Sequence, residues 1–182
     1  MLSEMREVKL EPGVISYNIG ISACEKGGQP QWALSLLREM SASKSPPDVV
    51  TYSAGISACG SRGLWRDALS LMGELRDSKL QPNTISYNAA IDACTHGGRF
   101  QEACLLLKQL QGERLEPDAR SYGAAISSCD VAGKWREALL LFRELLEASV
   151  EPSTHTRNAA MSACERGGRW QEALLLLGEA GL

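Results

Sequence analysis

Apolar side chains along the chain follow two helical patterns that alternate. In the first pattern Tyr87, Ile91 and Cys94 stand at i, i+4 and i+7, which places them on one face of a helix. In the second pattern, residues 135–145 carry apolar side chains at i, i+3, i+7 and i+10, again on one face. A hydroxyl residue near the start of each first helix is predicted to be its N-cap; these residues are Ser16, Thr51, Ser86, Ser121 and Thr156.

Both patterns return with a period of 35 residues and without an insertion. The residues that keep this step include Gly28, Gly63, Gly98, Gly133 and Gly168 at a predicted left-handed corner, and Pro12, Pro47, Pro82, Pro117 and Pro152. The predicted units span 14–48, 49–83, 84–118, 119–153 and an incomplete 154–182, and residues 1–13 read as the end of a preceding unit. Neither helix of a unit can bury its apolar face alone. We therefore expect an all-α fold, a right-handed superhelical solenoid of stacked antiparallel helix pairs.

The two ends of the sequence show no polar capping helix. The sequence begins within a unit and stops before the linker of its last unit. Because solenoids normally need such caps for solubility, we expect either a slice of a longer array or self-association through the uncapped array ends.

Composition and charge narrow the class of protein without naming a ligand. The chain is 44% hydrophobic and 23% charged, which is typical of globular proteins. Its net charge of −3 gives no global basic field that would indicate a nucleic-acid ligand. No apolar run reaches the roughly 18 residues of a membrane span, so no membrane partner is expected. The first 13 residues resemble neither a signal peptide nor a transit peptide, so the compartment is unknown from sequence.

Cysteine and histidine are the candidates for site chemistry. Five of the six cysteines stand one period apart, at points of stacked helices about 8–10 Å apart, too far for disulfides. Cys104 replaces a leucine and has no partner in the sequence, and no close cysteine pair predicts zinc. We expect all six to be small buried thiols. His96 and His155 lie in no metal or nucleophile motif, so we expect no catalytic residue, no metal and no cofactor, and hence no enzyme.

The stretch VVTYSAGISACGSRGLWRDALSLMGELRDSKLQPN, residues 49–83, resembles the pentatricopeptide repeat. The resemblance rests on the tyrosine before a variable residue, the corner glycine, the Ala-Leu of the second helix and the terminal Pro-Asp or Pro-Asn, and it covers essentially the whole chain. The related tetratricopeptide repeat has a period of 34 and usually binds peptides. The resemblance implies binding of single-stranded RNA at about one base per repeat.

The resemblance also implies that the residue after the tyrosine and the last residue of the unit read the base. The candidate base-reading residues are Asn18, Asp48, Ser53, Asn83, Asn88, Asp118, Gly123, Ser153 and Asn158. The first and third pairs resemble a uridine-preferring pair and the second an adenine-preferring pair. The fourth, Gly123 with Ser153, matches no common pair, and Asn158 suggests a pyrimidine. The expected target is 5′-U-A-U-N-Y-3′.

The residues themselves offer separate support for a polar face. Asn18, Ser22 and Glu25 stand at i, i+4 and i+7, beside the apolar stripe, and this pattern predicts one common groove along the units. Asn88 is accordingly expected to point out of the core. The alternative is that small polar residues early in a helix, and Asp or Asn after Pro, are local cap and turn chemistry.

Base stacking and phosphate contact are two further roles that the resemblance implies. Ile15, Val50 and Ile85, two residues before the tyrosines, are expected to sandwich bases. Arg120 and His155 hold this position in the later units, where a guanidinium can also stack on a base. The candidate phosphate contacts are Lys26, His96 and Arg166. Acidic residues nearby would oppose phosphate, so we expect modest, salt-sensitive affinity.

The expected function is sequence-selective binding of single-stranded RNA, in the service of RNA processing, stabilisation, splicing or translation. The resemblance implies a mitochondrial or chloroplast location. One alternative is a scaffold that binds protein partners in the same groove as extended peptides, which the acidic balance favours. Another is a degenerate array without a ligand.

Overall fold

The part of the chain that can be described consists of paired helices. The computed structural model describes residues 13–43 and 45–178, and within these ranges it contains ten α-helices and no β-strand. The helices are α2 (Val14–Lys26), α3 (Pro30–Ala42), α4 (Val49–Gly60), α5 (Trp65–Asp77), α6 (Thr84–His96), α7 (Phe100–Gly112), α8 (Ala119–Val131), α9 (Trp135–Glu147), α10 (Thr154–Arg166) and α11 (Trp170–Gly178). The predicted remnant of a preceding unit, 1–13, lies outside the described residues apart from Gly13.

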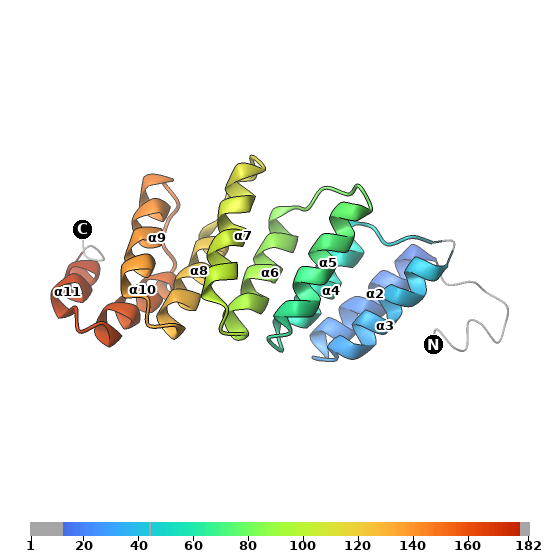
Figure 1. The fold of residues 1–182 in the computed structure, drawn as a ribbon, viewed down its shortest axis with the longest axis horizontal. Helices are drawn as coiled ribbons and strands as arrows, with labels where there is room; N and C mark the ends of the chain where they lie inside the picture. Colours follow the sequence, from blue (N-terminus) through green and yellow to red (C-terminus); the bar gives the residue numbers. More distant parts are fainter. Residues whose placement is uncertain (1–12, 44, 179–182) are drawn as a thin grey trace.

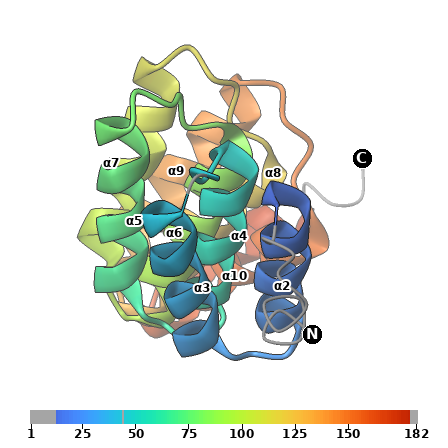
Figure 2. The same cartoon turned by 90° about the vertical axis from the view of Figure 1, so that its right-hand side faces the viewer.

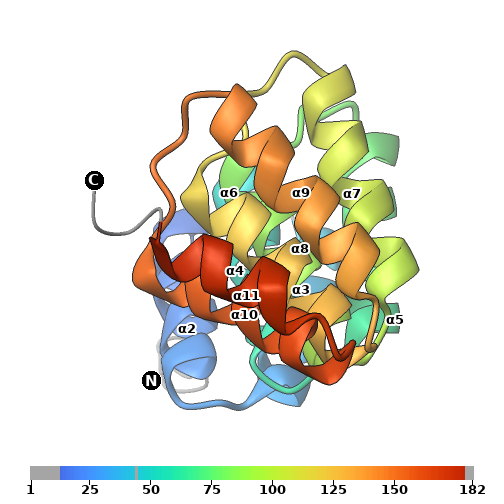
Figure 3. The same ribbon diagram turned by 90° about the vertical axis from the view of Figure 1, so that its left-hand side faces the viewer.

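The helix pairs stack one after another along the longest axis of the molecule (Figure 1). Each even-numbered helix packs against the even-numbered helices before and after it, and against the odd-numbered helix that follows it. The views along the array show α5 and α7 on one side and α2 and α4 on the other (Figures 2 and 3). The predicted all-α solenoid of stacked helix pairs is confirmed. None of the described helices combines the length and apolarity that crossing a membrane requires.

The core lies between the two layers of helices. The predicted stripe Tyr87, Ile91 and Cys94 is completely buried, and so are Ala103 and Leu110 on the second helix of the same pair. Because these side chains are small or aliphatic apart from the tyrosine, the two layers approach closely. The corner glycines have φ between +61° and +68°, as predicted, which is the left-handed region that glycine adopts without strain.

The starts of the even-numbered helices differ from the prediction. Helices α4, α6, α8 and α10 begin after the N-caps Asp48, Asn83, Asp118 and Ser153. The hydroxyl residues predicted as N-caps (Ser16, Thr51, Ser86, Ser121 and Thr156) instead stand at N3. In α4, α6 and α8 the hydroxyl accepts the N–H of the N-cap residue, while the side chain of that residue accepts the N–H at N3, which makes a reciprocal capping box. The last residue of each unit therefore initiates the helix of the next unit.

Tryptophans at the start of the odd-numbered helices pack onto the next unit. The guanidinium groups of Arg66 and Arg99 lie over the Trp65 ring, 4.7 and 4.4 Å from its centre. A Cβ added at Gly97 would overlap Trp65, so only glycine leaves room for the indole in this arrangement. Trp135 repeats the arrangement two units later, with Arg136 and Arg169 over its ring.

Candidate nucleic-acid interface

The candidate base-reading residues lie along the layer of even-numbered helices. One member of each pair is the fifth residue of an even-numbered helix, and the other is the N-cap of the next even-numbered helix. Because these helices stack side by side, the two members approach each other across the joint between units. The geometry of the three pairs expected to read a defined base differs from unit to unit.

In the third unit the two candidate residues contact each other directly. The Asn88 amide nitrogen donates to the Asp118 carboxylate, with the oxygens 3.1 and 3.3 Å away. The Ser121 hydroxyl donates to the Asn88 amide oxygen over 2.5 Å. Asn88 is only 5% exposed, so the expectation that it points out of the core is wrong. An amide can donate two hydrogen bonds and accept two, so these contacts use only part of the hydrogen-bonding capacity of Asn88.

The Asp118 carboxylate is held in its ionised form. Burial alone would raise its pKa, but hydrogen bonds from the Ser121 backbone N–H and the Asn88 amide, with the Ser121 hydroxyl 2.9 Å from Oδ1, lower the pKa below the ordinary value. The carboxylate therefore fixes which way the Asn88 amide faces, since a flipped amide would bring two acceptors together. Asp118 is thus both the N-cap of α8 and the partner that orients Asn88.

In the first unit the contact is relayed by a hydroxyl. Thr51 Oγ1 donates to the Asn18 amide oxygen at 2.5 Å and lies 2.7 Å from Asp48 Oδ1. Partial burial would raise the pKa of Asp48, but the contacts of its carboxylate with Thr51, above all with the Thr51 backbone N–H, outweigh burial and lower the pKa. Asn18 is half-buried, and it lines a cavity that runs from α2 across α4 to α6.

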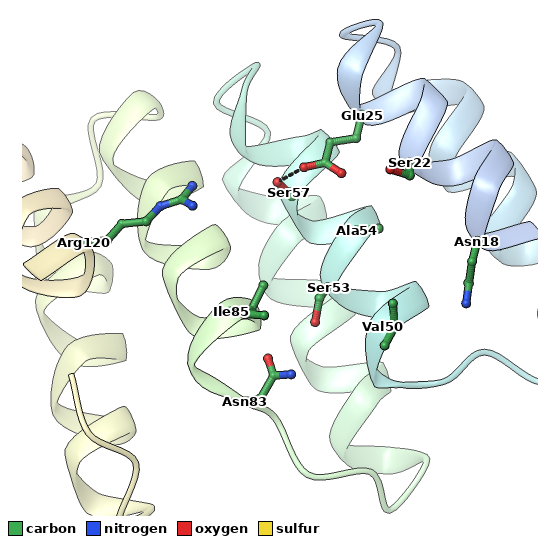
Figure 4. Close-up of a pocket in the computed structure, with 10 residues that line it drawn as sticks. All are labelled: Asn18, Ser22, Glu25, Val50, Ser53, Ala54, Ser57, Asn83, Ile85 and Arg120. Atoms are coloured by element: carbon green, nitrogen blue, oxygen red, sulfur yellow. Dashed lines mark hydrogen bonds between the residues drawn. The ribbon is translucent and has the colours of Figure 1, made fainter. Parts of the chain in front are cut away.

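In the second unit the two candidate residues, Ser53 and Asn83, line the same cavity, and no hydrogen bond joins their side chains (Figure 4). The Ser53 hydroxyl donates to the Val49 carbonyl over 2.7 Å, and the Asn83 side chain accepts the Ser86 N–H over 2.9 Å. Figure 4 shows Ser53 and Val50 on α4, and Asn83 and Ile85 at the start of α6, among the residues that line the cavity.

The last two units are less complete. Gly123 has no side chain, and the Thr156 hydroxyl stands 2.8 Å from the place where a Cβ would be, so the structure leaves no space for one. Ser153 accepts the Thr156 N–H as the N-cap of α10. Asn158 is exposed and lines a shallow pocket with Met161 and Glu165. The fourth unit therefore offers no side chain at the first base-reading position.

The predicted stacking residues are exposed apolar side chains beside these pairs. Ile15, Val50 and Ile85 are 77%, 63% and 67% exposed. Apolar groups aligned at one position of successive units form a surface suited to a flat or apolar ligand. In the later units Arg120 forms an ion pair with Asp92, 2.8 Å away, and the His155 ring lies 3.1 Å from the Ser127 hydroxyl.

The predicted phosphate contacts differ in availability. Lys26 is exposed and lines a pocket with Ile15 and Asn18. The His96 ring contacts the Asp92 carbonyl over 2.8 Å, and Arg166 forms an ion pair with Asp130 over 3.3 Å. Phosphate contact by these three residues stays a prediction.

The cysteines depart from the expectation in two respects. All six are free thiols, and four are buried, but Cys24 and Cys104 are half-buried. Cys104 does have a partner, because its sulfur lies 3.7 Å from that of Cys129. The 35-residue period does not predict this pair, because its two cysteines do not stand at equivalent positions of their units. The pair joins the second helix of one unit to the first helix of the next. Within the described residues no three metal-binding side chains converge.

Comparisons with known proteins identify the repeat. The chain matches the PPR repeat family over residues 12–61 and 47–96, and the PPR repeat over residues 85–115, 120–150 and 155–180. No curated protein sequence matches it.

Solved structures share the fold. The pentatricopeptide repeat protein PPR10 from maize is 27% identical, with a TM-score of 0.76, over 98% of this chain and 26% of that one. Its complex with an 18-nucleotide psaJ RNA element is 28% identical, with a TM-score of 0.79, over 92% of this chain and 25% of that one. The PPR domain of Arabidopsis thaliana protein-only RNase P 1, solved with tRNA, is 18% identical, with a TM-score of 0.75, over 88% of this chain and 86% of that one.

This chain spans about a quarter of the length of the maize protein. The family matches together cover nearly all of its residues, and they do so in the same register as the structural repeat. The chain therefore belongs to the pentatricopeptide repeat family.

Proposed function

We propose that this array binds single-stranded RNA in a sequence-selective way, at about one base per repeat. The observation that carries the proposal is the contact between the fifth residue of one helix and the N-cap of the next, seen at Asn88 with Asp118 and, through Thr51, at Asn18 with Asp48. These polar pairs recur beside exposed apolar residues. Such an arrangement suits a chain of bases, whose polar edges form hydrogen bonds and whose flat faces pack on apolar side chains. The maize relative, 28% identical, has been solved in complex with RNA.

Each pair presents a fixed hydrogen-bonding edge. In the third unit, the Asp118 carboxylate and the Ser121 hydroxyl leave one N–H and one oxygen lone pair of the Asn88 amide for a base. Uracil offers a donor and acceptors on one edge, which such an amide matches. The second unit, with a serine and an asparagine cap, offers a different edge and is assigned adenine. The proposed target is 5′-U-A-U-N-Y-3′, in which the fourth position is unselective because Gly123 has no side chain.

The exposed apolar residues supply the faces. Ile15, Val50 and Ile85 lie at one position of successive units, and a base inserted between two of them would bury apolar surface on both sides. Contacts with base faces contribute about 1–3 kcal/mol per base when the platform is aromatic, and aliphatic side chains would contribute toward the lower end of this range. Few repeats and a net negative charge make the proposed binding modest in strength.

The decisive experiment recodes one unit. The double variant Asn88→Ser with Asp118→Asn copies the Ser53 and Asn83 pair of the second unit into the third. Binding of short oligonucleotides that differ only at the third base is measured by fluorescence anisotropy. Wild type should prefer U over A at this position by about 3–10-fold, the worth of one hydrogen bond, and the double variant should reverse the preference.

Two results would contradict the proposal. Equal affinity of wild type for oligonucleotides containing UAU and GCG, at moderate salt, would remove base reading altogether. Saturable binding of an extended peptide that persists at high salt, without RNA binding, would favour the protein scaffold instead. We propose that the array binds without catalysis of its own, and that processing, stability or translation of the bound RNA is the downstream effect.

A further inference from the structure

Two thiols from neighbouring repeats touch inside the array. Cys104 belongs to α7 and Cys129 to α8, and their sulfur atoms are 3.7 Å apart. Cys129 is completely buried, whereas Cys104 is half-buried and therefore the more exposed of the two. At the position of Cys104 the other four units carry Leu34, Leu69, Leu139 and Leu174. The juxtaposition therefore occurs at one joint of the array.

We propose that Cys104 and Cys129 form a disulfide when the protein meets a low-molecular-weight disulfide oxidant, and that this bond ties α7 to α8. A disulfide needs its sulfur atoms about 2.05 Å apart. The two atoms must therefore approach by only about 1.7 Å, which small rotations about the Cα–Cβ bonds provide. The closed loop spans residues 104–129 and crosses the joint between the third and fourth repeats.

The two thiols differ in a way that sets the order of the reaction. A hydrogen bond from the neighbouring Cys129 thiol lowers the pKa of Cys104. The same contact, together with burial, raises the pKa of Cys129. Cys104 is thus the more readily ionised and the more accessible of the two, as an attacking thiolate must be.

The exchange proceeds in two balanced steps. The Cys104 thiolate attacks one sulfur of the oxidant, the oxidant's S–S bond breaks, and one small thiolate leaves. Cys129 then loses its proton to solvent and attacks the Cys104 sulfur, which releases the second small thiolate. Two protein thiols are oxidised, and one oxidant disulfide is reduced to two thiols.

Oxidised glutathione is a suitable oxidant for the test. The fully reduced protein shows six free thiols, and after oxidation we expect four, with a mass lower by two hydrogen atoms. Trypsin should then release a disulfide-linked pair made of peptide 100–108 and peptide 121–134, each of which contains a single cysteine. Because the bond removes freedom from the unfolded chain, the melting temperature should rise by about 5 °C or more.

Variants that respect the repeat provide the controls. Cys104→Leu restores the residue of the other units, so it should fold normally and retain all five of its remaining thiols. Adding Leu139→Cys to this variant should create an equivalent pair with Cys164 one unit later and restore the loss of two thiols.

Three outcomes would overturn the proposal. The first is a stable glutathione adduct on Cys104 with Cys129 still free. The second is a mixture of pairings among the six cysteines, and the third is a dimer linked between chains. None of these measurements depends on RNA, so failure here is distinguishable from failure of the proposed function.

Discussion

Asp118 lies where helix initiation and the candidate interface meet, and its replacement tests both. Asp118→Ala removes the N-cap of α8, a loss of about 0.5–2 kcal/mol. It also leaves the buried Asn88 amide without its acceptor, which costs a further 1–3 kcal/mol or so. We therefore expect the free energy of unfolding to fall by about 2–4 kcal/mol at pH 7.

Asp118→Asn is the matched control. Asparagine caps helices about as well as aspartate does, and Asn83 already holds the same position one unit earlier. Both the Ser121 N–H and the Asn88 amide reach Oδ1 of Asp118, so a single amide oxygen at this position can accept from both. The amide nitrogen of the variant replaces Oδ2, however, which lies 3.3 Å from the Asn88 nitrogen, so two donors face each other there. We expect this variant to lose about 0.5–1 kcal/mol, less than Asp118→Ala.

The two variants also separate charge from shape through pH. The folded-state pKa of Asp118 lies below its ordinary value of 3.8, so the ionised form stabilises the fold. This contribution is fully present above about pH 5 and is lost as the pH falls through the ordinary pKa toward the folded-state pKa. The stability advantage of wild type over Asp118→Asn should therefore shrink between pH 7 and pH 3.

Urea denaturation followed by circular dichroism at pH 7 and pH 3 measures both effects. If Asp118→Ala unfolds within about 0.5 kcal/mol of wild type at pH 7, the contacts of Asp118 contribute little and the reasoning fails. A pH dependence of Asp118→Asn identical to that of wild type would show that the carboxylate charge is irrelevant.

Two further predictions concern the joints between repeats. Gly97→Ala should destabilise the fold by about 1–3 kcal/mol and alter tryptophan fluorescence, because the added methyl group displaces Trp65. The control Gly73→Ala, with no atom near its added Cβ, should be neutral or slightly stabilising. Arg120→Val should lower the free energy of unfolding by less than about 1 kcal/mol, as measured by thermal melts, because the arginine of the ion pair with Asp92 is largely exposed. The same variant should bind UAU oligonucleotides as tightly as wild type or more tightly. A tenfold loss of RNA affinity in Arg120→Val would show instead that the guanidinium itself contacts RNA.

The period of the sequence was enough to predict the architecture, because stacked identical units leave few ways to bury their apolar faces. The stripe of Tyr87, Ile91 and Cys94 is buried, and the corner glycines are left-handed, as their spacing predicted. The sequence pattern places the caps three residues too late. Asp118 and Ser121 can each cap a helix, and only the backbone positions decide which of them stands before the first turn.

The side-chain contacts between units were the part that periodicity did not predict. Asn88 was expected to face outward because it lies beside the apolar stripe, yet α8 stacks over it and supplies Asp118 and Ser121 as partners. The Cys104 and Cys129 contact and the Arg120 and Asp92 ion pair likewise join residues 25 and 28 positions apart. A repeat of 35 aligns equivalent residues, whereas these pairs depend on the stagger between one helix and the next.

The capping boxes restrict which residue types can stand at the last position of each unit. The last residue of a unit must start the next helix, and the residues found there are Asp48, Asn83, Asp118 and Ser153, all of them strong helix initiators. If the same side chain also contributes to base selection, the residue types available for recognition at this position are limited to those that can begin a helix. A larger or apolar residue introduced at this position to change the base preference would remove the N-cap. It would therefore destabilise the start of the next helix, at the same joint whose base preference it alters.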